Sequence, residues 1–350
     1  MSGQAGAPRD PRALARAISA IEAGAPVGAE TLRRLAGAAV PHAHVVGLTG
    51  PPGSGKSTLA DALTEAWRAE GRSVAILAVD PSSPFTGGAL LGDRVRMQRH
   101  ATDPDVFIRS MGARGHLGGL ASATRAAVRL LDTAGWDVVL LETVGVGQSE
   151  LEVCGIADTV AVVTTPTAGD GVQIIKAGIM EVGDLFVVNK ADLEGAARTV
   201  REIRDLVRAR PGAAAGGDGA WTPPVLATTA VQQAAAVREL VPALDRHRAF
   251  LAETGRQAAH RQQRLLAEVL DRVRERAGLL AQALLAREGV AALVPDADPQ
   301  VIDPERVASA LLRRMGEGAV AARGGAPEPA PALPEPMGVP VGRAPHPEGA

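Results

Sequence analysis

The stretch GPPGSGKST, residues 50–58, follows directly on the apolar run VVGLT at residues 45–49. Its spacing, a glycine, four further residues and then Gly-Lys-Ser, is that of a phosphate-binding loop. Glycines allow backbone amides to converge on phosphate oxygens, and the helix that follows adds the positive end of its dipole. An apolar strand before the loop and a helical segment after it supply the expected context. We therefore predict a nucleotide phosphate site here.

Two side chains of this loop carry chemistry. Lys56 is expected to reach the β- and γ-phosphates, and the Ser57 hydroxyl to ligate Mg²⁺. The loop by itself leaves open phosphoryl transfer to a metabolite, movement driven by ATP, and a protein encounter timed by GTP. The residues expected to surround the nucleotide phosphates are Gly50, Pro51, Pro52, Gly53, Ser54, Gly55, Lys56, Ser57 and Thr58.

Short apolar runs alternate with helical segments through the middle of the chain. Continuous runs of Val, Ile and Leu indicate strands buried on both faces, as in mostly parallel sheets covered by helices. The runs are residues 45–49, 74–80, 105–110, 136–142, 158–165, 184–190 and 224–228. The predicted fold class is therefore α/β, of the P-loop NTPase type, with a mostly parallel sheet.

The two ends of the chain differ from this middle part. Residues 11–40 read as two short amphipathic helices, and the Leu-rich segment 257–286 reads as a long helix that packs on its own domain or, as periodicity slightly favours, against a second subunit. The last residues are dense in Pro and Gly and are expected to be disordered. The predicted divisions are 1–40 for an N-terminal helical extension, 41–255 for the nucleotide domain, 256–320 for a C-terminal helical arm and 321–350 for the tail.

Composition narrows the function classes. The 350 residues carry a formal net charge of −2 and no Tyr, so neither a basic excess nor stacking aromatics argues for nucleic acid. The single cysteine, Cys154, excludes an intramolecular disulfide and is interpreted as a small structural residue in a partly apolar segment. No signal peptide or membrane-length apolar run is visible. We expect a cytoplasmic protein that binds neither nucleic acid nor membrane.

Two carboxylates end neighbouring runs of the predicted sheet. Asp80 ends VAILAVD, Glu142 ends WDVVLLE, and either could hold the metal directly or through water. Gly145, in ETVGVGQSE, could offer its amide to a γ-phosphate. The polar segment at residues 80–97 suits a loop that orders around a metal-bound γ-phosphate, although an ordinary surface loop has the same composition.

The choice of base is indicated by VVNKAD, at the end of a further buried run. The Asp192 carboxylate can accept from both N1–H and the 2-amino group of guanine, a pair that adenine does not offer. Asn189 stands at the same strand end, and Lys190 can lay its aliphatic stem on the base or brace the loop. This Asn-Lys-x-Asp pattern favours GTP over ATP. Thr229 and Ala230, after the next run, are weaker candidates for a second base-contacting loop.

Taken together, GPPGSGKST, VDPSSPFTGGALLGDRVRM, FIRSMGARGHLGGLA, ETVGVGQSE and NKAD resemble the MeaB/ArgK family of G proteins, from about residue 10 to 318. The resemblance implies a GTPase with GTP/GDP and Mg²⁺ that chaperones an adenosylcobalamin-dependent acyl-CoA mutase, typically methylmalonyl-CoA mutase. Such proteins gate cofactor loading and protect the mutase from inactivated cofactor. They are usually homodimers through a C-terminal helical arm, which implies that role for residues 257–318.

Site roles follow from the resemblance residue by residue. It implies catalytic roles for Lys56, Asp80 and Glu142. The implied metal and switch shell is Ser57, Asp80, Asp93 and Glu142. Residues 169–178, GDGVQIIKAG, look like a further switch segment that contacts the mutase, but the family commonly has two lysines where this chain has Lys176-Ala177. That departure concerns coupling to the partner and leaves the nucleotide site unaffected.

Two rival functions stay open on the sequence. A P-loop kinase linked to amino-acid transport is suggested by the older family label, although no segment shows an acceptor pocket and NKAD argues against ATP. Another GTPase of metallocofactor maturation would be expected to carry a His- or Cys-rich stretch, which this chain lacks. The mutase chaperone is the favoured hypothesis, with slow intrinsic hydrolysis that the partner accelerates.

Overall fold

The structure is a computed structural model. It describes residues 9–23, 43–80, 98–100, 102–112, 119–143, 154–166, 180–210, 220–229, 237–295 and 303–321. Two compact units are distinguished, residues 1–275 and 276–350, and each is treated by itself below. In the described residues no helix is both long enough and apolar enough to cross a membrane.

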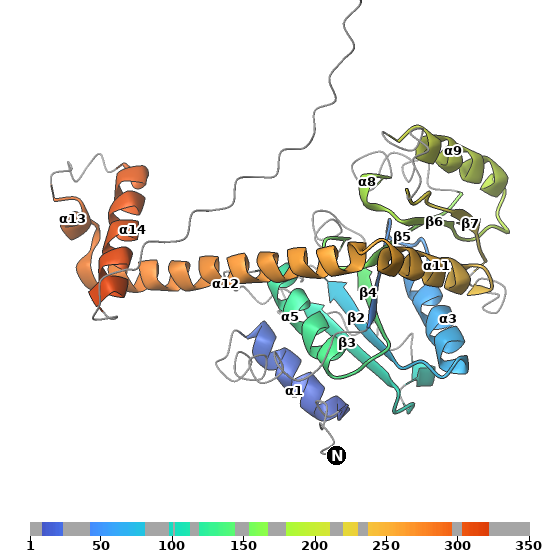
Figure 1. The fold of residues 1–350 in the computed structure, drawn as a ribbon, viewed down its shortest axis with the longest axis horizontal. Coiled ribbons are helices and arrows are strands. Elements are labelled where there is room, and N and C mark those ends of the chain that lie inside the picture. Colours follow the sequence, from blue (N-terminus) through green and yellow to red (C-terminus); the bar gives the residue numbers. More distant parts are fainter. Residues whose placement is uncertain are drawn as a thin grey trace, which may run out of the picture. The chain divides into compact units, whose positions relative to one another are not determined.

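The first unit is built on a seven-stranded sheet (Figure 1) in the order β3-β2-β4-β1-β5-β6-β7. All adjacent strands pair in parallel. The strands are β1 (His44–Thr49), β2 (Val74–Asp80), β3 (Val106–Gly112), β4 (Val138–Thr143), β5 (Thr159–Thr164), β6 (Leu185–Val188) and β7 (Val225–Ala227). Every apolar run named from the sequence contains one of these strands or overlaps it closely, which confirms the predicted α/β class.

Helices cover both faces of the sheet over three clusters of buried hydrophobic side chains. The helices of this unit are α1 (Pro11–Glu22), α3 (Lys56–Ala69), the short 3₁₀ turn η1 (Gln98–His100), α5 (Gly119–Thr133), α8 (Met180–Val182), α9 (Ala196–Arg208), α11 (Leu240–Glu253) and the first part of α12 (Arg256–Glu288). Alternate strand residues face opposite cores: Val45 and Leu77 join the α1/α5 side, whereas Val46 and Ile76 join the α3/α11 side. Continuous apolar strands are therefore required here.

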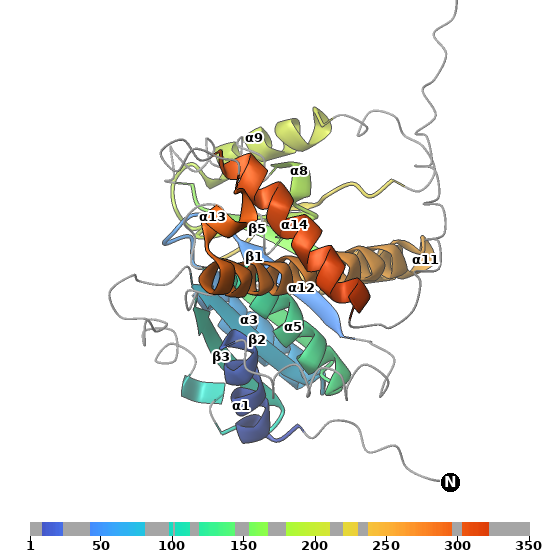
Figure 2. The ribbon, with the colours of Figure 1, turned by 90° about the vertical axis from the view of Figure 1, so that its left-hand side faces the viewer.

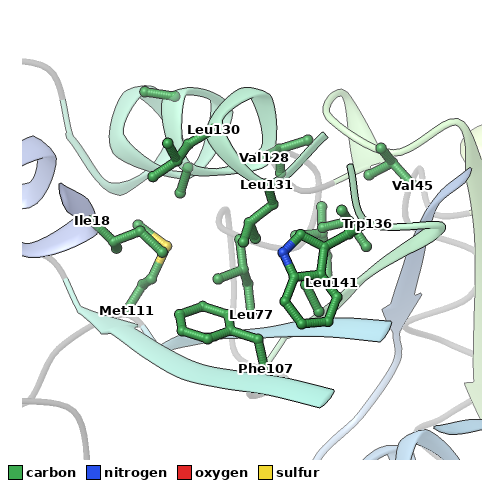
Figure 3. Close-up of a cluster of buried hydrophobic side chains, with 14 of the residues drawn as sticks. Ile18, Val45, Leu77, Phe107, Met111, Val128, Leu130, Leu131, Trp136 and Leu141 are labelled. Atoms are coloured by element: carbon green, nitrogen blue, oxygen red, sulfur yellow. The ribbon is translucent and has the colours of Figure 1, made fainter. Parts of the chain in front are cut away.

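The core on the α5 side is anchored by aromatic side chains (Figure 3). Phe107 of β3 and Trp136, just before β4, have ring centroids 6.2 Å apart, and both are buried against Leu131 of α5. Ile18 of α1 and Met111 of β3 extend the same cluster. The N-terminal helix is thus part of the nucleotide domain's core rather than an appendage to it.

Helix α1 is capped at its amino end by Asp10. The Asp10 carboxylate accepts hydrogen bonds from the backbone N–H groups of Arg12 and Ala13, at 3.0 and 3.2 Å, and Pro11 occupies the first helical position. A second helix, expected within residues 24–40, lies outside the described residues.

The second unit contains the end of α12, α13 (Val290–Leu293) and α14 (Pro304–Ala321), and α13 packs beside α14 (Figures 1 and 2). The Glu288 carboxylate accepts from Arg287 and lies 3.5 Å from the Arg314 guanidinium, and the pKa of Glu288 is lowered, chiefly by the Arg287 hydrogen bond. The division between the units falls inside α12, whereas the sequence places a boundary at the beginning of this helix.

Candidate nucleotide site

The phosphate loop leaves the sheet at its centre. Strand β1 pairs with β4 on one side and β5 on the other, so its carboxyl end is fixed from both sides. Two glycines of the loop permit no side chain. A Cβ on Gly50 would lie 1.9 Å from the Val163 carbonyl oxygen, and one on Gly55 would lie 2.3 Å from Asn189 Nδ2. Both glycines also have positive φ, which L-residues rarely adopt.

Lys56 is held inside this loop. Its side chain is almost fully buried, and Nζ donates to the carbonyl oxygens of Gly50 at 2.7 Å and Pro51 at 3.0 Å. A buried ammonium group needs anionic or hydrogen-bonding partners, and two loop carbonyls provide part of that set. The geometry places a positive charge within the loop, where phosphate oxygens would meet it.

The predicted metal ligands Ser57 and Glu142 are brought together. The Ser57 hydroxyl, in the first turn of α3, donates to Glu142 Oε1, and Glu142 is only 4% exposed. The register explains this proximity, because Glu142 of β4 lies opposite Leu48 of β1 and Ala78 of β2. A hydroxyl and a carboxylate are both oxygen donors, the class that Mg²⁺ prefers, so this pair fits the metal.

The remaining predicted phosphate and metal residues are only partly described. The backbone of Asp80 ends β2, one position beyond the residue that pairs with Thr143. That position is at the same edge of the sheet as Glu142. Asp93, Gly145 and the segment 169–178 with Lys176-Ala177 lie outside the described residues.

The Asn-Lys-x-Asp segment is bonded directly to the phosphate loop. Asn189 Nδ2 donates to the Ser54 carbonyl oxygen at 2.8 Å, and Lys190 Nζ donates to the Gly53 carbonyl oxygen at 2.9 Å. Lys190 has φ 56° and is the sole non-glycine residue with positive φ in the described backbone. This turn leaves Asp192 exposed to solvent, with its carboxylate available to a base.

The residues that follow β7 contact the Asn-Lys-x-Asp turn at the carboxyl edge of the sheet. The Ala191 N–H donates to the Thr228 carbonyl oxygen at 2.9 Å, and the Thr228 hydroxyl lies 3.4 Å from Asn189 Oδ1. The structure therefore places the predicted second base loop beside the first. Thr229 is half-buried next to this contact, and Ala230 lies outside the described residues.

Sequence reasoning missed one anchor close to the site. Asp61, one turn after Ser57 in α3, is buried, pairs with Arg99 and lies 3.2 Å from His100 Nε2. Burial, followed by the positive charge of Arg99, lowers the pKa of His100. An acid in the middle of an otherwise ordinary amphipathic helix gives no sequence signal of such a role.

A polar chain of His44, Thr159, His247 and Asp184 lies at the opposite edge of the sheet. The Thr159 hydroxyl is 2.8 Å from both His44 Nε2 and His247 Nδ1, and His247 Nε2 is 3.5 Å from Asp184 Oδ1. Burial lowers the pKa of His44 to about 3 and that of His247 to about 4. Burial also raises the pKa of Asp184 to about 7. This chain joins strands β1 and β5 to α11.

A phosphate loop at the centre of a parallel sheet, bonded to an Asn-Lys-x-Asp turn, defines the class: a P-loop protein built for guanine nucleotides. The chain belongs to the MeaB family. The family profile described as "Methylmalonyl Co-A mutase-associated GTPase MeaB" matches residues 14–286.

Curated and solved relatives agree with this assignment. A putative GTPase of Pyrococcus abyssi is 44% identical over 312 residues, which cover 87% of this chain and 93% of the relative. The mitochondrial methylmalonic aciduria type A homolog of Mus musculus is 44% identical over 147 residues, 42% of this chain and 35% of that protein. The crystal structure of a protein named "LAO/AO transport system kinase" superposes with a TM-score of 0.62 at 27% identity, over 88% of this chain and 94% of that one. The protein is a GTPase.

Proposed function

We propose that this GTPase is a chaperone of an adenosylcobalamin-dependent acyl-CoA mutase, in the first place methylmalonyl-CoA mutase. It would gate cofactor loading and protect the mutase from inactivation. The observation that carries the proposal is the bonding of a guanine-type turn to the phosphate loop in a chain that matches the mutase-associated family along residues 14–286. A nucleotide site of this kind serves as a timer for another enzyme.

The described side chains account for the binding steps. Lys56 would neutralise charge on the β- and γ-phosphates, and the loop amides would stabilise the transferring group. Ser57 and Glu142, with Asp80 and Asp93, would hold Mg²⁺, which when bound neutralises charge on the β- and γ-phosphate oxygens. Among the described residues, all those that we assign to the site bind phosphate, metal or base, and none is assigned to water activation. We therefore expect slow intrinsic hydrolysis that the partner accelerates.

We propose that one partner of this protein is a second copy of the same chain, bound through α12. Helix α12 carries an apolar stripe, defined here as Leu265, Leu266, Val269, Leu270 and Val273, and each of these side chains is 49–57% exposed. The charged residues on the other side of the same turns face the domain: Glu268 lies 3.0 Å from Arg129, and Asp271 pairs with Arg125.

A helix with its polar side inward and its leucines outward is expected to be covered by another chain. The stripe repeats at three- and four-residue spacing. Helix-to-helix association of two copies suits this arrangement, because identical stripes are self-complementary about a two-fold axis. The proposed assembly is therefore a homodimer formed through α12.

Hydrolysis assays test the proposal. Purified protein is incubated with GTP or ATP and Mg²⁺, alone and with candidate cobalamin-dependent mutases, and phosphate release is measured. We expect slow, GTP-selective turnover that one mutase stimulates. Turnover that is fast alone and indifferent to every mutase tested would contradict the chaperone role.

A second candidate function is a P-loop kinase linked to amino-acid transport. One observation favours it, namely that the similar crystal structure is of a protein named as a transport system kinase. The same assay distinguishes the two functions. A kinase would prefer ATP and place phosphate on a small molecule or protein without any mutase, whereas the proposed GTPase releases it to water.

A further inference from the structure

Side chains of α12 contact the residues that directly precede β1 and β5. The Arg261 guanidinium donates to the Ala43 carbonyl oxygen at 3.3 Å. Arg264 donates to the Ile156 carbonyl oxygen and forms an ion pair with Asp158, with 2.7 Å between guanidinium nitrogen and Oδ1. Two turns of one helix therefore contact the amino-terminal edge of the sheet at the strand that leads to the phosphate loop.

Asp158 connects these contacts to β1 itself. Its other carboxylate oxygen accepts the Val45 N–H at 3.0 Å, and its own backbone N–H donates to the Val45 carbonyl oxygen at 2.7 Å. The side chain is fully buried, with 0% exposure. A buried carboxylate is stable only with a close counter-charge, which Arg264 provides. The Asp158–Arg264 ion pair thus connects α12 with strand β1, beside the Arg261 contact to Ala43.

The same turns of α12 also carry the apolar stripe. Leu265 and Leu266 follow Arg264 directly in the sequence, and both are at least half exposed. Arg261, Arg264 and Glu268 are spaced by three and four residues and so share one side of the helix, whereas the stripe occupies the other side. Anything that shifts α12 from the stripe side therefore moves the residues that hold β1.

Strand β1 connects the Asp158–Arg264 ion pair, called the joint below, with the nucleotide site. From Val45 to Gly50 the chain advances five residues, about 16 Å at the rise of a β-strand. From Val46 to Leu48 the strand pairs with both β4 and β5, and all six residues of β1 are buried. A strand that is paired on both sides in a close-packed core moves as a unit rather than bending locally. A displacement of the amino end of β1 is therefore expected to displace the phosphate loop that holds Lys56.

We propose that Asp158 and Arg264 are positioning residues for the phosphate loop, through which association along the apolar stripe changes nucleotide affinity. Neither side chain belongs to the nucleotide site. By linkage, bound nucleotide changes the strength of association by the same factor. This proposal rests on the proposed self-association through α12. It does not require that a mutase stimulates hydrolysis.

The test is a two-by-two comparison in the full chain, with no mutase present. Wild type, Leu270→Glu in the stripe, Arg264→Gln, and the two changes combined are each titrated with GDP and Mg²⁺, and their oligomeric states are measured by sedimentation. We expect Leu270→Glu to abolish association and to change the GDP dissociation constant about three- to tenfold, a typical coupling. In the Arg264→Gln background the same stripe change is expected to leave GDP affinity within about twofold.

Controls separate positioning from a general loss of structure. Arg272→Gln removes an ion pair to Glu275 that lies within α12, at 3.3 Å, and should leave the stripe effect intact. If Arg264→Gln does not fold, the double variant Asp158→Asn/Arg264→Gln takes its place, because it removes the buried charge together with its counter-charge. The Asn amide oxygen can still accept the Val45 N–H in that variant.

Three outcomes would overturn the proposal. They are a wild type that stays monomeric, a stripe variant that binds GDP as wild type does, and a stripe effect that persists undiminished after the joint is removed. Failure of the mutase to stimulate hydrolysis would contradict the proposed function and leave this coupling standing, so the two failures are distinguishable.

Discussion

Replacing Asp184 by Asn is expected to make the protein more sensitive to acid, although removing a carboxylate usually does the opposite. Asp184 has a folded-state pKa of about 7, raised chiefly by burial, against about 3.8 when unfolded. A raised pKa means that the folded state binds the proton more tightly. The stability from this group is therefore fully present below pH 3.8 and is lost as pH rises through 7.

The two buried histidines act in the other direction. Their pKa values of about 3 and about 4 in the fold lie below the ordinary 6.5, so the unfolded chain takes up protons first as pH falls. Between pH 7 and pH 5, His44 and His247 each remove about 2 kcal/mol from the free energy of unfolding. As pH falls from 7 to 5, protonation of Asp184 adds up to about 2 kcal/mol to the free energy of unfolding. We reduce this to about 1–2 kcal/mol because the side chain is 29% exposed.

Wild type should therefore lose about 2–3 kcal/mol between pH 7 and pH 5 from these three groups, and Asp184→Asn about 4 kcal/mol. The assay is urea unfolding at pH 7, 6 and 5, followed by tryptophan fluorescence, since the Trp221 ring lies 4.6 Å from the His247 ring. Asp205→Asn, at an exposed i,i+3 ion pair, is the matched control and should follow wild type. Equal acid sensitivity in Asp184→Asn and wild type would refute the argument.

Three further predictions concern the nucleotide site. Asp192→Asn replaces an acceptor by a donor at the base edge. In competition binding, GTP affinity should therefore fall at least about tenfold while affinity for a xanthine nucleotide rises. Unchanged GTP affinity would place guanine recognition elsewhere. Asn189→Ala removes the hydrogen bond to Ser54 and should weaken GDP binding by about 1–3 kcal/mol in calorimetry, whereas an effect only on unfolding would make Asn189 merely structural. Glu142→Gln should raise the Mg²⁺ concentration needed for hydrolysis several-fold, and an unaltered requirement would exclude Glu142 from the metal shell.

The sheet could be predicted because its strands are buried on both faces. The apolar stretches VVGL and VVLL, within the runs VVGLT and WDVVLLE, have no alternating polar position to face solvent, which favours a helix-covered parallel sheet. The expectation that Asp80 and Glu142 share one edge followed from the same logic, since parallel strands end at one edge. These parts of the fold and site depend on local pattern, which a single sequence displays.

Other contacts depend on distance in sequence and could not be predicted. Nothing in NKAD indicates that Asn189 donates to Ser54, 135 positions away, rather than to the nucleotide. Asp158 and Thr159 open an apolar run as an ordinary polar pair, yet they hold β1, α11 and α12 together. The leucines of 257–286 suggested a partner, but only the structure shows that the charged side of this helix faces the domain.

The ion pair between Asp158 and Arg264 has a consequence for how such chains can be recombined. A cut before α12 would remove the counter-charge of Asp158 together with the helix that covers it, so we expect a domain ending at residue 255 to be less stable than the full chain. The same ion pair constrains how the helical arm can be exchanged between related proteins. An arm exchanged between relatives would be accepted only where both members of the pair are exchanged together or are already shared, which ties the evolution of the helix to one residue in the sheet.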